Sequence, residues 1–201
     1  MNFRTEQERR LIAYTQERYG EMLSLFLLSG LGEEGRAGAR HFTICEMNWD
    51  ENIIRRRLVL SSDSEESPLP HGRDPLVFVA ILKLLRERGK ADKVRFRLAD
   101  LTALLGWDDT AESAQAVSGA IGRYYSATLT ALPQRGERYT EESSPLGRGS
   151  RILIERETQV AEGEGAGRSY FGLAFHLEFS LWLRHKILLG IDWKRVVVIE
   201  V

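Results

Sequence analysis

The stretch VRFRLADLTALLGWDDTAESAQAVSGAIGRYY, residues 94–125, holds three structural signals within little more than thirty residues. Apolar residues alternate with arginines in Val94–Leu98, which predicts a short strand with one buried and one basic face. A leucine-rich run then predicts a helix over Ala99–Leu105, which Gly106 ends. After a polar turn, a second helical pattern predicts a longer helix over Thr110–Tyr125.

The longer helix has one apolar face and one small, polar face. Asp109 or Thr110 can cap it, and Asp109 has Glu112 three residues on as a capping-box partner. The side chains predicted to face inward recur at helical spacing and are Ala114, Val117, Ala120, Ile121 and Tyr124. Those predicted to face outward are Gln115, Ser118, Gly119, Gly122 and Arg123.

A connector and another helix precede this stretch. Ser61–Asp74 is polar and contains prolines, which is typical of a connector. Asp74 and Pro75 are residue types that begin helices, and a broad apolar face follows them. We therefore expect a helix over Asp74–Arg88 that Gly89 ends.

Nearer the N-terminus, Thr5 and Glu8 form a capping-box pattern, and apolar spacing predicts a helix over Glu6–Leu28. Two extended runs follow, HFTICEMNW at residues 41–49 and NIIRRRLVLS at 52–61, which predict a β-hairpin. We expect this helix and hairpin to pack on the rest of the chain, with part of their apolar face serving a homodimer.

Three β-prone runs come after the long helix, at Thr128–Leu132, Arg151–Gln159 and Tyr170–Glu178. The order helix, short strand, helix, helix, hairpin is that of a winged helix-turn-helix, expected over Asp74–Gln159. The predicted fold class is α+β, a winged helix-turn-helix with an N-terminal helix and β-hairpin extension. We expect residues 1–66 to form the extension and residues 67–201 the winged-helix domain with a C-terminal strand and helix.

The composition is that of an ordinary soluble globular protein, since 43% of the 201 residues are hydrophobic and 28% are charged. The longest apolar runs are too short to cross a bilayer, and no signal-peptide pattern surrounds them. This predicts a cytoplasmic protein with no membrane partner. The single cysteine, Cys45, excludes an intrachain disulfide.

The distribution of charge matters more than its sum. A formal net charge of −1 argues against coating nucleic acid by bulk electrostatics. Residues 83–97, however, hold seven basic residues against two acidic ones. We therefore predict double-stranded DNA as the partner, read by the outward face of the long helix in a major groove, with Arg95 and Arg97 of the short strand beside it.

The same features fit a second interpretation. Small residues on a helix also mark helix packing, and winged helices also serve as protein-interaction modules. The alternative function is thus a protein-interaction or dimerisation module, or a transcriptional regulator.

The sequence carries no pattern that is typical of an enzyme. GEEGRAG at residues 32–38 lacks the Gly-Lys-Ser/Thr ending of a phosphate loop, and GEGAGRS at 163–169 has the same weakness. His176 and Glu178 would share one strand face, but two residues do not make a metal site. We expect no catalytic role, no cofactor and no metal.

Three segments occur in a suggestive order: SPLPHGRDPLVFVAILKLL, then VRFRLADLTALLGW, then AVSGAIGRYYSATLTAL. In this order they resemble the plasmid replication initiator family, winged-helix initiators of the replication initiator protein A type. The match covers about Pro68–Leu132, and the later FGLAFHLEFSLWL fits more loosely. Tyr124 and Tyr125 stand where the family tends to have leucine-like residues.

The resemblance implies a non-enzymatic protein that binds repeated sequences at a plasmid origin and recruits host replication proteins. It implies that the outward residues of the long helix face the groove and that the wing contains Arg135, Arg138, Arg148 and Arg151. Typical initiators continue into a second winged helix. A chain ending in VVVIEV would then be a first-domain fragment or a truncated relative.

Overall fold

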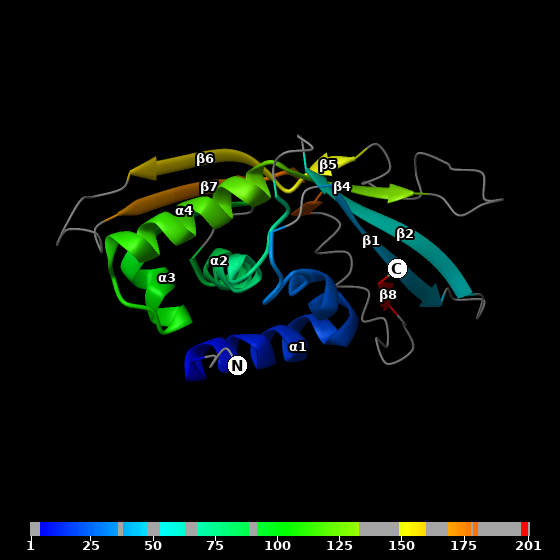
Figure 1. The fold of residues 1–201 in the computed structure, drawn as a ribbon, viewed down its shortest axis with the longest axis horizontal. Helices are drawn as coiled ribbons and strands as arrows, with labels where there is room; N and C mark the ends of the chain where they lie inside the picture. The colour runs from blue at the N-terminus through cyan, green and yellow to red at the C-terminus, as the bar shows by residue number, and fades with distance from the viewer. Residues whose placement is uncertain are drawn as a thin grey trace.

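The computed structural model describes residues 5–35, 38–47, 53–62, 68–88, 92–132, 149–159, 169–177, 179–180 and 198–200. These residues form a mixed structure of α-helices and two antiparallel sheets. The helices gather at one end of the molecule, and the larger sheet extends away from them (Figure 1).

The helical part contains α1 (Glu6–Leu27), α2 (Asp74–Arg88), α3 (Leu98–Leu105) and α4 (Ala111–Tyr125). α2 is central, in contact with α1, α3 and α4. The run LVFVAIL within α2 explains this position, because a helix that is apolar on every side must be surrounded by other elements. Figure 1 shows α1 on one side of α2 and α4 on the other.

The first turn of α1 is attached to the turn between α3 and α4. Thr5 and Glu8 form the predicted capping box, with N–H to side-chain oxygen distances of 3.0 and 3.1 Å. The Thr5 hydroxyl also donates to Leu105 O at 2.9 Å. Trp107 Nε1 donates to Glu8 Oε1 at 3.1 Å. Because the Glu8 side chain is buried, these bonds satisfy its carboxylate and fix α1 against α3.

The smaller sheet has three strands in the order β3-β7-β6, namely β3 (Lys93–Arg97), β7 (Tyr170–Phe175) and β6 (Leu153–Gln159). The larger sheet has the order β5-β4-β2-β1-β8. Its strands are β1 (Ala39–Met47), β2 (Ile53–Ser62), β4 (Ala127–Leu132), β5 (Ser150–Arg151) and β8 (Val198–Glu200). All pairings in both sheets are antiparallel.

Aromatic side chains connect the helices to both sheets. The Phe78 ring of α2 stacks on Tyr124 of α4 with centroids 4.1 Å apart, and it lies 6.0 Å from Phe175 of β7. Phe26 of α1 packs edge-on against Phe42 of β1 at 5.2 Å. All five rings are buried, and burying each contributes roughly 1.5–3 kcal/mol. One hydrophobic core therefore joins α1 and the hairpin to the central helices.

The predicted helices and the hairpin are confirmed. Each of the four helices agrees with its predicted range to within one residue at either end. β1 pairs with β2 in the predicted antiparallel manner, from Ala39 opposite Ser61 to Met47 opposite Ile53.

The predictions for the chain after α4 are partly wrong. The Arg151–Gln159 run is not one strand, because the chain turns at the buried Ile152 and divides into β5 and β6, which belong to different sheets. β5 pairs with β4, which continues the sheet of the N-terminal hairpin instead of flanking α4. The strand that pairs with β3 is β7, so the unit around α2 to α4 extends to Phe175 and not to Gln159.

Candidate nucleic-acid interface

Local features set the start of α4. Thr110 is its N-cap, with an extended backbone and a hydroxyl that accepts from the Ser113 N–H at 3.2 Å. Asp109, the other predicted cap, instead accepts a hydrogen bond from the Thr102 hydroxyl of α3. α3 ends at Gly106 with φ 68°, a left-handed conformation that disfavours other residues. The short turn from α3 to α4 is thus fixed at both ends.

The predicted inward face of α4 is confirmed, since all five of its side chains are buried. Tyr124 makes the largest contact, with its ring stacked on Phe78 at an interplanar angle of 13°. Burial raises the pKa of the Tyr124 phenol far above its ordinary value, so the phenol stays neutral. Tyr124 therefore anchors α4 to α2 through its apolar ring.

The predicted outward residues avoid the core. Gln115 is exposed, and the half-buried ones are Ser118, Gly119, Gly122 and Arg123. Two arginine side chains lie against the glycines. A Cβ built on Gly119 would lie 3.3 Å from Arg123 Nη2, and one built on Gly122 would lie 3.2 Å from Arg156 Nη1. The glycines therefore leave room for guanidinium groups along this face.

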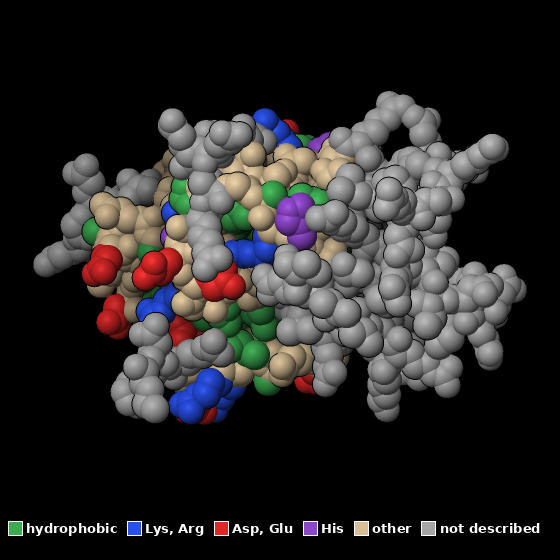
Figure 2. Space-filling model, turned by 45° about the vertical axis from the view of Figure 1, so that its right-hand side comes forward, with side chains coloured by type: hydrophobic (Ala, Val, Ile, Leu, Met, Phe, Trp, Pro, Cys, Tyr) green, Lys and Arg blue, Asp and Glu red, His purple; other side chains and the backbone are tan. Residues whose placement is uncertain are grey.

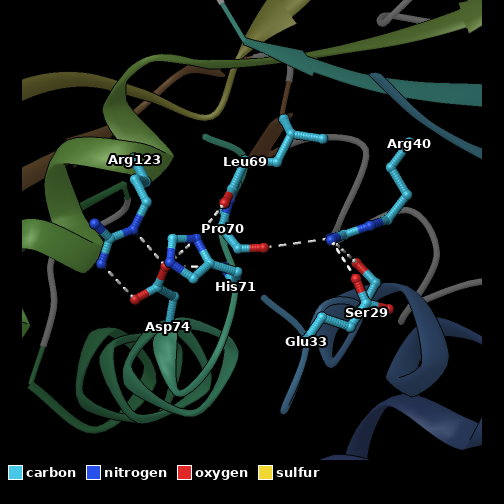
Figure 3. Close-up of polar contacts among 8 residues, drawn as sticks. All are labelled: Ser29, Glu33, Arg40, Leu69, Pro70, His71, Asp74 and Arg123. Carbon is cyan, nitrogen blue, oxygen red and sulfur yellow. Dashed lines mark hydrogen bonds and ion pairs between the residues drawn. The ribbon is translucent and has the colours of Figure 1, made fainter. Parts of the chain in front are cut away.

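Arg123 is held by α2. Its Nε lies 2.5 Å from Asp74 Oδ2 and its Nη2 2.8 Å from Asp74 Oδ1, which makes a bidentate pair (Figure 3). The hydrogen bonds to Asp74 raise the pKa of Arg123. The Arg123 side chain is 27% exposed and that of Asp74 8%. Part of the guanidinium thus stabilises the fold, and only its remaining N–H groups are available to a ligand.

The Asp74 carboxylate also binds the loop before α2. Asp74 Oδ2 accepts from the His71 N–H at 2.9 Å. The adjacent Pro70 O accepts from Arg40 Nη1 at 3.3 Å, and Arg40 Nη2 pairs with Glu33 at 2.9 Å. Figure 3 shows these contacts running from Arg123 to the turn after α1. The position of α4 is therefore tied to the N-terminal extension by polar contacts as well as by packing.

The basic residues of the run that the structure describes, within 83–88 and 92–97, do not form one continuous positive surface. Lys83 Nζ lies 5.1 Å from the ring centroid of Tyr14 in α1, and Arg86 donates to the Tyr14 hydroxyl at 3.4 Å. Arg88 pairs with Asp100 of α3 at 2.7 Å. These charges point toward α1 and α3, away from the outward face of α4. The face in Figure 2 likewise has basic, acidic and apolar side chains interspersed.

Arg95 and Arg97 lie on the exposed side of β3, as the alternating pattern predicted. Arg95 Nη2 lies 3.9 Å from Glu157 Oε2 of β6. The two side chains meet across Gly172 of β7, where a Cβ would touch both of them. Both partners are more than half exposed, so this pair contributes little to stability.

Of the predicted wing, only Arg151 belongs to the described residues, and Arg135, Arg138 and Arg148 lie outside them. Arg151 Cζ is 5.8 Å from the ring centroid of Tyr125, at the end of α4. Arg156 Cζ lies over the same ring at 5.0 Å. The sequence pattern did not indicate Arg156, because nothing local shows that β6 runs beside α4.

A hollow of about 620 Å³ lies on the other flank of α4. It opens between the start of α2, the turn after α3 and the first turns of α4, and its lining includes Arg73, Trp107, Glu112, Ala116 and Arg123. Arg73 Cζ lies 5.6 Å over the Trp107 ring. The lining therefore combines an aromatic surface with charges of both signs.

Two kinds of site are absent from the described residues. No helix among them is both long and apolar enough to cross a bilayer. Among the same residues, no three His, Cys, Asp or Glu side chains are placed to hold a metal ion. His176 Nδ1 lies 2.8 Å from Ser150 Oγ, and Glu178 is outside the described residues.

Comparison with known proteins reveals a shared fold. No family model matches the chain, and no curated protein matches its sequence. A crystal structure of RctB domains 2–3 is similar, with a TM-score of 0.54, 15% identity, and coverage of 79% of this chain and 58% of that chain. A selenomethionine derivative of the same two domains also has a TM-score of 0.54 and 15% identity, and the match covers 77% of this chain and 59% of that chain. The chain thus shares a fold with RctB domains 2–3 and spans only part of their length.

Proposed function

We propose that this chain is a DNA-binding, non-enzymatic module of a plasmid replication initiator. In this proposal α2, β3, α3, α4, β6 and β7 form a winged helix-turn-helix in which α4 enters the major groove and β6–β7 is the wing. The element order and the position of β7 between β3 and β6 support this assignment.

The observation that carries the proposal is the outward face of α4. Gly119 and Gly122 add no side-chain bulk to this face and leave room for the guanidinium groups that lie against them, and Gln115 is a residue type that reads adenine. Arg123 and Arg156 lie on its two flanks. The fold shared with domains of the replication initiator RctB, and the order of motifs that resembles plasmid initiators, support the same class of function.

The proposed protein acts in the cytoplasm on double-stranded origin repeats, as a homodimer that recruits host replication proteins. Because the surface charge is mixed, its affinity for unrelated DNA is modest and the specific contacts supply most of the binding energy. Sedimentation tests the dimer separately. A monomer at high protein concentration would remove the dimer and leave the DNA proposal intact.

DNA binding is tested by fluorescence anisotropy with two labelled duplexes of equal length, one from the origin of the parent replicon and one of mixed sequence, across a salt series. Gly119→Glu places bulk and negative charge at the closest approach, and we expect it to weaken binding to both duplexes at least tenfold. A Cβ on Gly119 would lie 3.3 Å from Arg123 Nη2, which pairs with Asp74, so the guanidinium must shift by a few tenths of an ångström, and circular dichroism verifies that the variant is folded. Ala13→Glu adds the same charge at an exposed position of α1 and serves as the matched control.

The hollow beside α4 favours the second candidate function, a protein-interaction module. An aromatic ring and charges of both signs suit a peptide better than a row of phosphates. If Gly119→Glu stays folded and binds DNA as tightly as the control Ala13→Glu and the wild type, α4 is not the DNA-reading element. The protein-interaction function then becomes the better account.

A further inference from the structure

We propose, building on the function proposed above, that Arg156 of β6 binds a DNA phosphate beside α4 and that Tyr125 positions it. Arg156 lies on β6, part of the wing in the function proposed above, and is not among the site residues that the sequence predicted. The contact would fix the position of the duplex relative to α4 without reading a base.

Sheet register explains why Arg156 points toward α4. Arg156 lies opposite Leu173 of β7, which lies opposite Val94 of β3. Val94 and Leu173 are buried beneath the helices, and neighbours across strands share one face of a sheet. β6 is the edge strand of the three-stranded sheet, so this helix-facing side chain projects past the core and remains exposed.

The Arg156 guanidinium packs against the end of α4. Arg156 Cζ lies 5.0 Å from the Tyr125 ring centroid, a cation–π distance. Its Nη1 lies 3.2 Å from the position of a Cβ on Gly122, so a larger residue there would displace it. A guanidinium placed over a ring still presents the N–H groups along its edge, which suits the bidentate binding of a phosphate.

The charges around Arg156 favour an anion. Within the described part of the chain Arg156 forms no ion pair, in contrast to Arg123. Arg151 brings a second positive charge to the same ring. Glu155 and Glu157 extend from the opposite face of β6, where they pair with basic residues of β3. The acidic neighbours are thereby neutralised on the far side of the sheet.

The test measures anisotropy of a labelled mixed-sequence duplex between about 50 and 200 mM salt, with wild type and five variants. Arg156→Gln should weaken binding roughly tenfold at the lowest salt and reduce the slope of log affinity against log salt by about one. Arg156→Lys keeps the charge but loses the planar guanidinium that binds a phosphate through two N–H groups. It should retain the slope and lose part of the affinity. Arg9→Gln removes one charge from α1, on the far side of the helices in Figure 1, and should change neither quantity.

Two further variants test the positioning role. Tyr125→Leu should weaken binding several-fold, and Tyr125→Phe, which keeps the ring, should restore wild-type affinity. Circular dichroism verifies that each variant is folded. If Gly119→Glu abolishes binding while Arg156→Gln matches Arg9→Gln, the phosphate contact is wrong and the DNA-binding function stands. If the wild type binds neither the mixed-sequence nor the origin duplex at low salt, both proposals fail.

Discussion

Replacing Arg123 by alanine should destabilise the fold, because it leaves the Asp74 carboxylate buried with fewer hydrogen bonds. The substitution removes bonds of 2.5 and 2.8 Å and leaves the His71 N–H as a partner. Breaking a buried ion pair by removing one partner costs about 3–5 kcal/mol. The Arg123 side chain is 27% exposed, so water screens part of the interaction with Asp74. We therefore expect the free energy of unfolding to fall by about 2 kcal/mol.

Thermal unfolding followed by circular dichroism measures this loss. For a chain of this size, 2 kcal/mol corresponds to a Tm about 4–8 °C lower. Alanine and arginine have similar helix propensities, so the helix itself is not the cause. Arg10→Ala is the control, since it breaks the exposed pair with Glu6 and should cost about 0.5 kcal/mol or less.

A double-mutant cycle with Asp74→Asn isolates the pair itself. We expect a coupling energy of about 1–2 kcal/mol between Arg123 and Asp74. Equal Tm values for Arg123→Ala and Arg10→Ala, together with zero coupling, would refute the reasoning. Arg123 would then be a free surface arginine whose role, if any, lies in binding DNA.

Three other substitutions test the remaining contacts. Gly122→Ala should raise the Tm slightly, because alanine favours a helix by about 0.5–1 kcal/mol, and should weaken DNA binding only slightly, because its Cβ shifts the Arg156 guanidinium by a few tenths of an ångström; a large loss of affinity would contradict the second part. Phe78→Ala should lower the free energy of unfolding by about 3–5 kcal/mol and the Tm by at least about 6 °C, since the Phe78 ring contacts α4 and β7. Burial opposes ionisation of Asp100, but hydrogen bonds from Arg88 and from a backbone N–H lower its pKa. Its stabilisation should therefore be complete above the unfolded pKa of about 3.9 and disappear as pH falls through the lower folded value. The Tm difference between wild type and Asp100→Asn should shrink over that range, and a constant difference would contradict the assignment.

The helices and the faces of α4 follow from the sequence because helical periodicity is local. Val117, Ile121 and Tyr124 recur at i, i+4 and i+7, and such a row must face the core. Gly106 ends α3 through a backbone conformation that the local sequence selects. Alternation in Val94–Leu98 likewise predicted one buried and one exposed face, which the strand Lys93–Arg97 has. Each of these features depends on residues within a few positions of one another.

The pairing of strands that are distant in the sequence could not be predicted in the same way. The Arg151–Gln159 run reads as one strand, and only the burial of Ile152 shows where the chain turns between two sheets. Arg95 and Glu157 are 62 residues apart and meet because β7 places Gly172 between them. The basic run therefore looked continuous in the sequence, although its charges point in several directions on the folded surface.

The sequence alone determined which side of α4 faces outward and that this side is small and polar. The tertiary structure decided which cations lie along it. Arg123 is held by Asp74, 49 residues earlier in the chain, and Arg156 reaches Gly122 from the edge of a separate sheet. The physical reason is range: periodicity and capping act within a turn or two of helix, whereas the partner of a charge depends on which distant segments the core brings together.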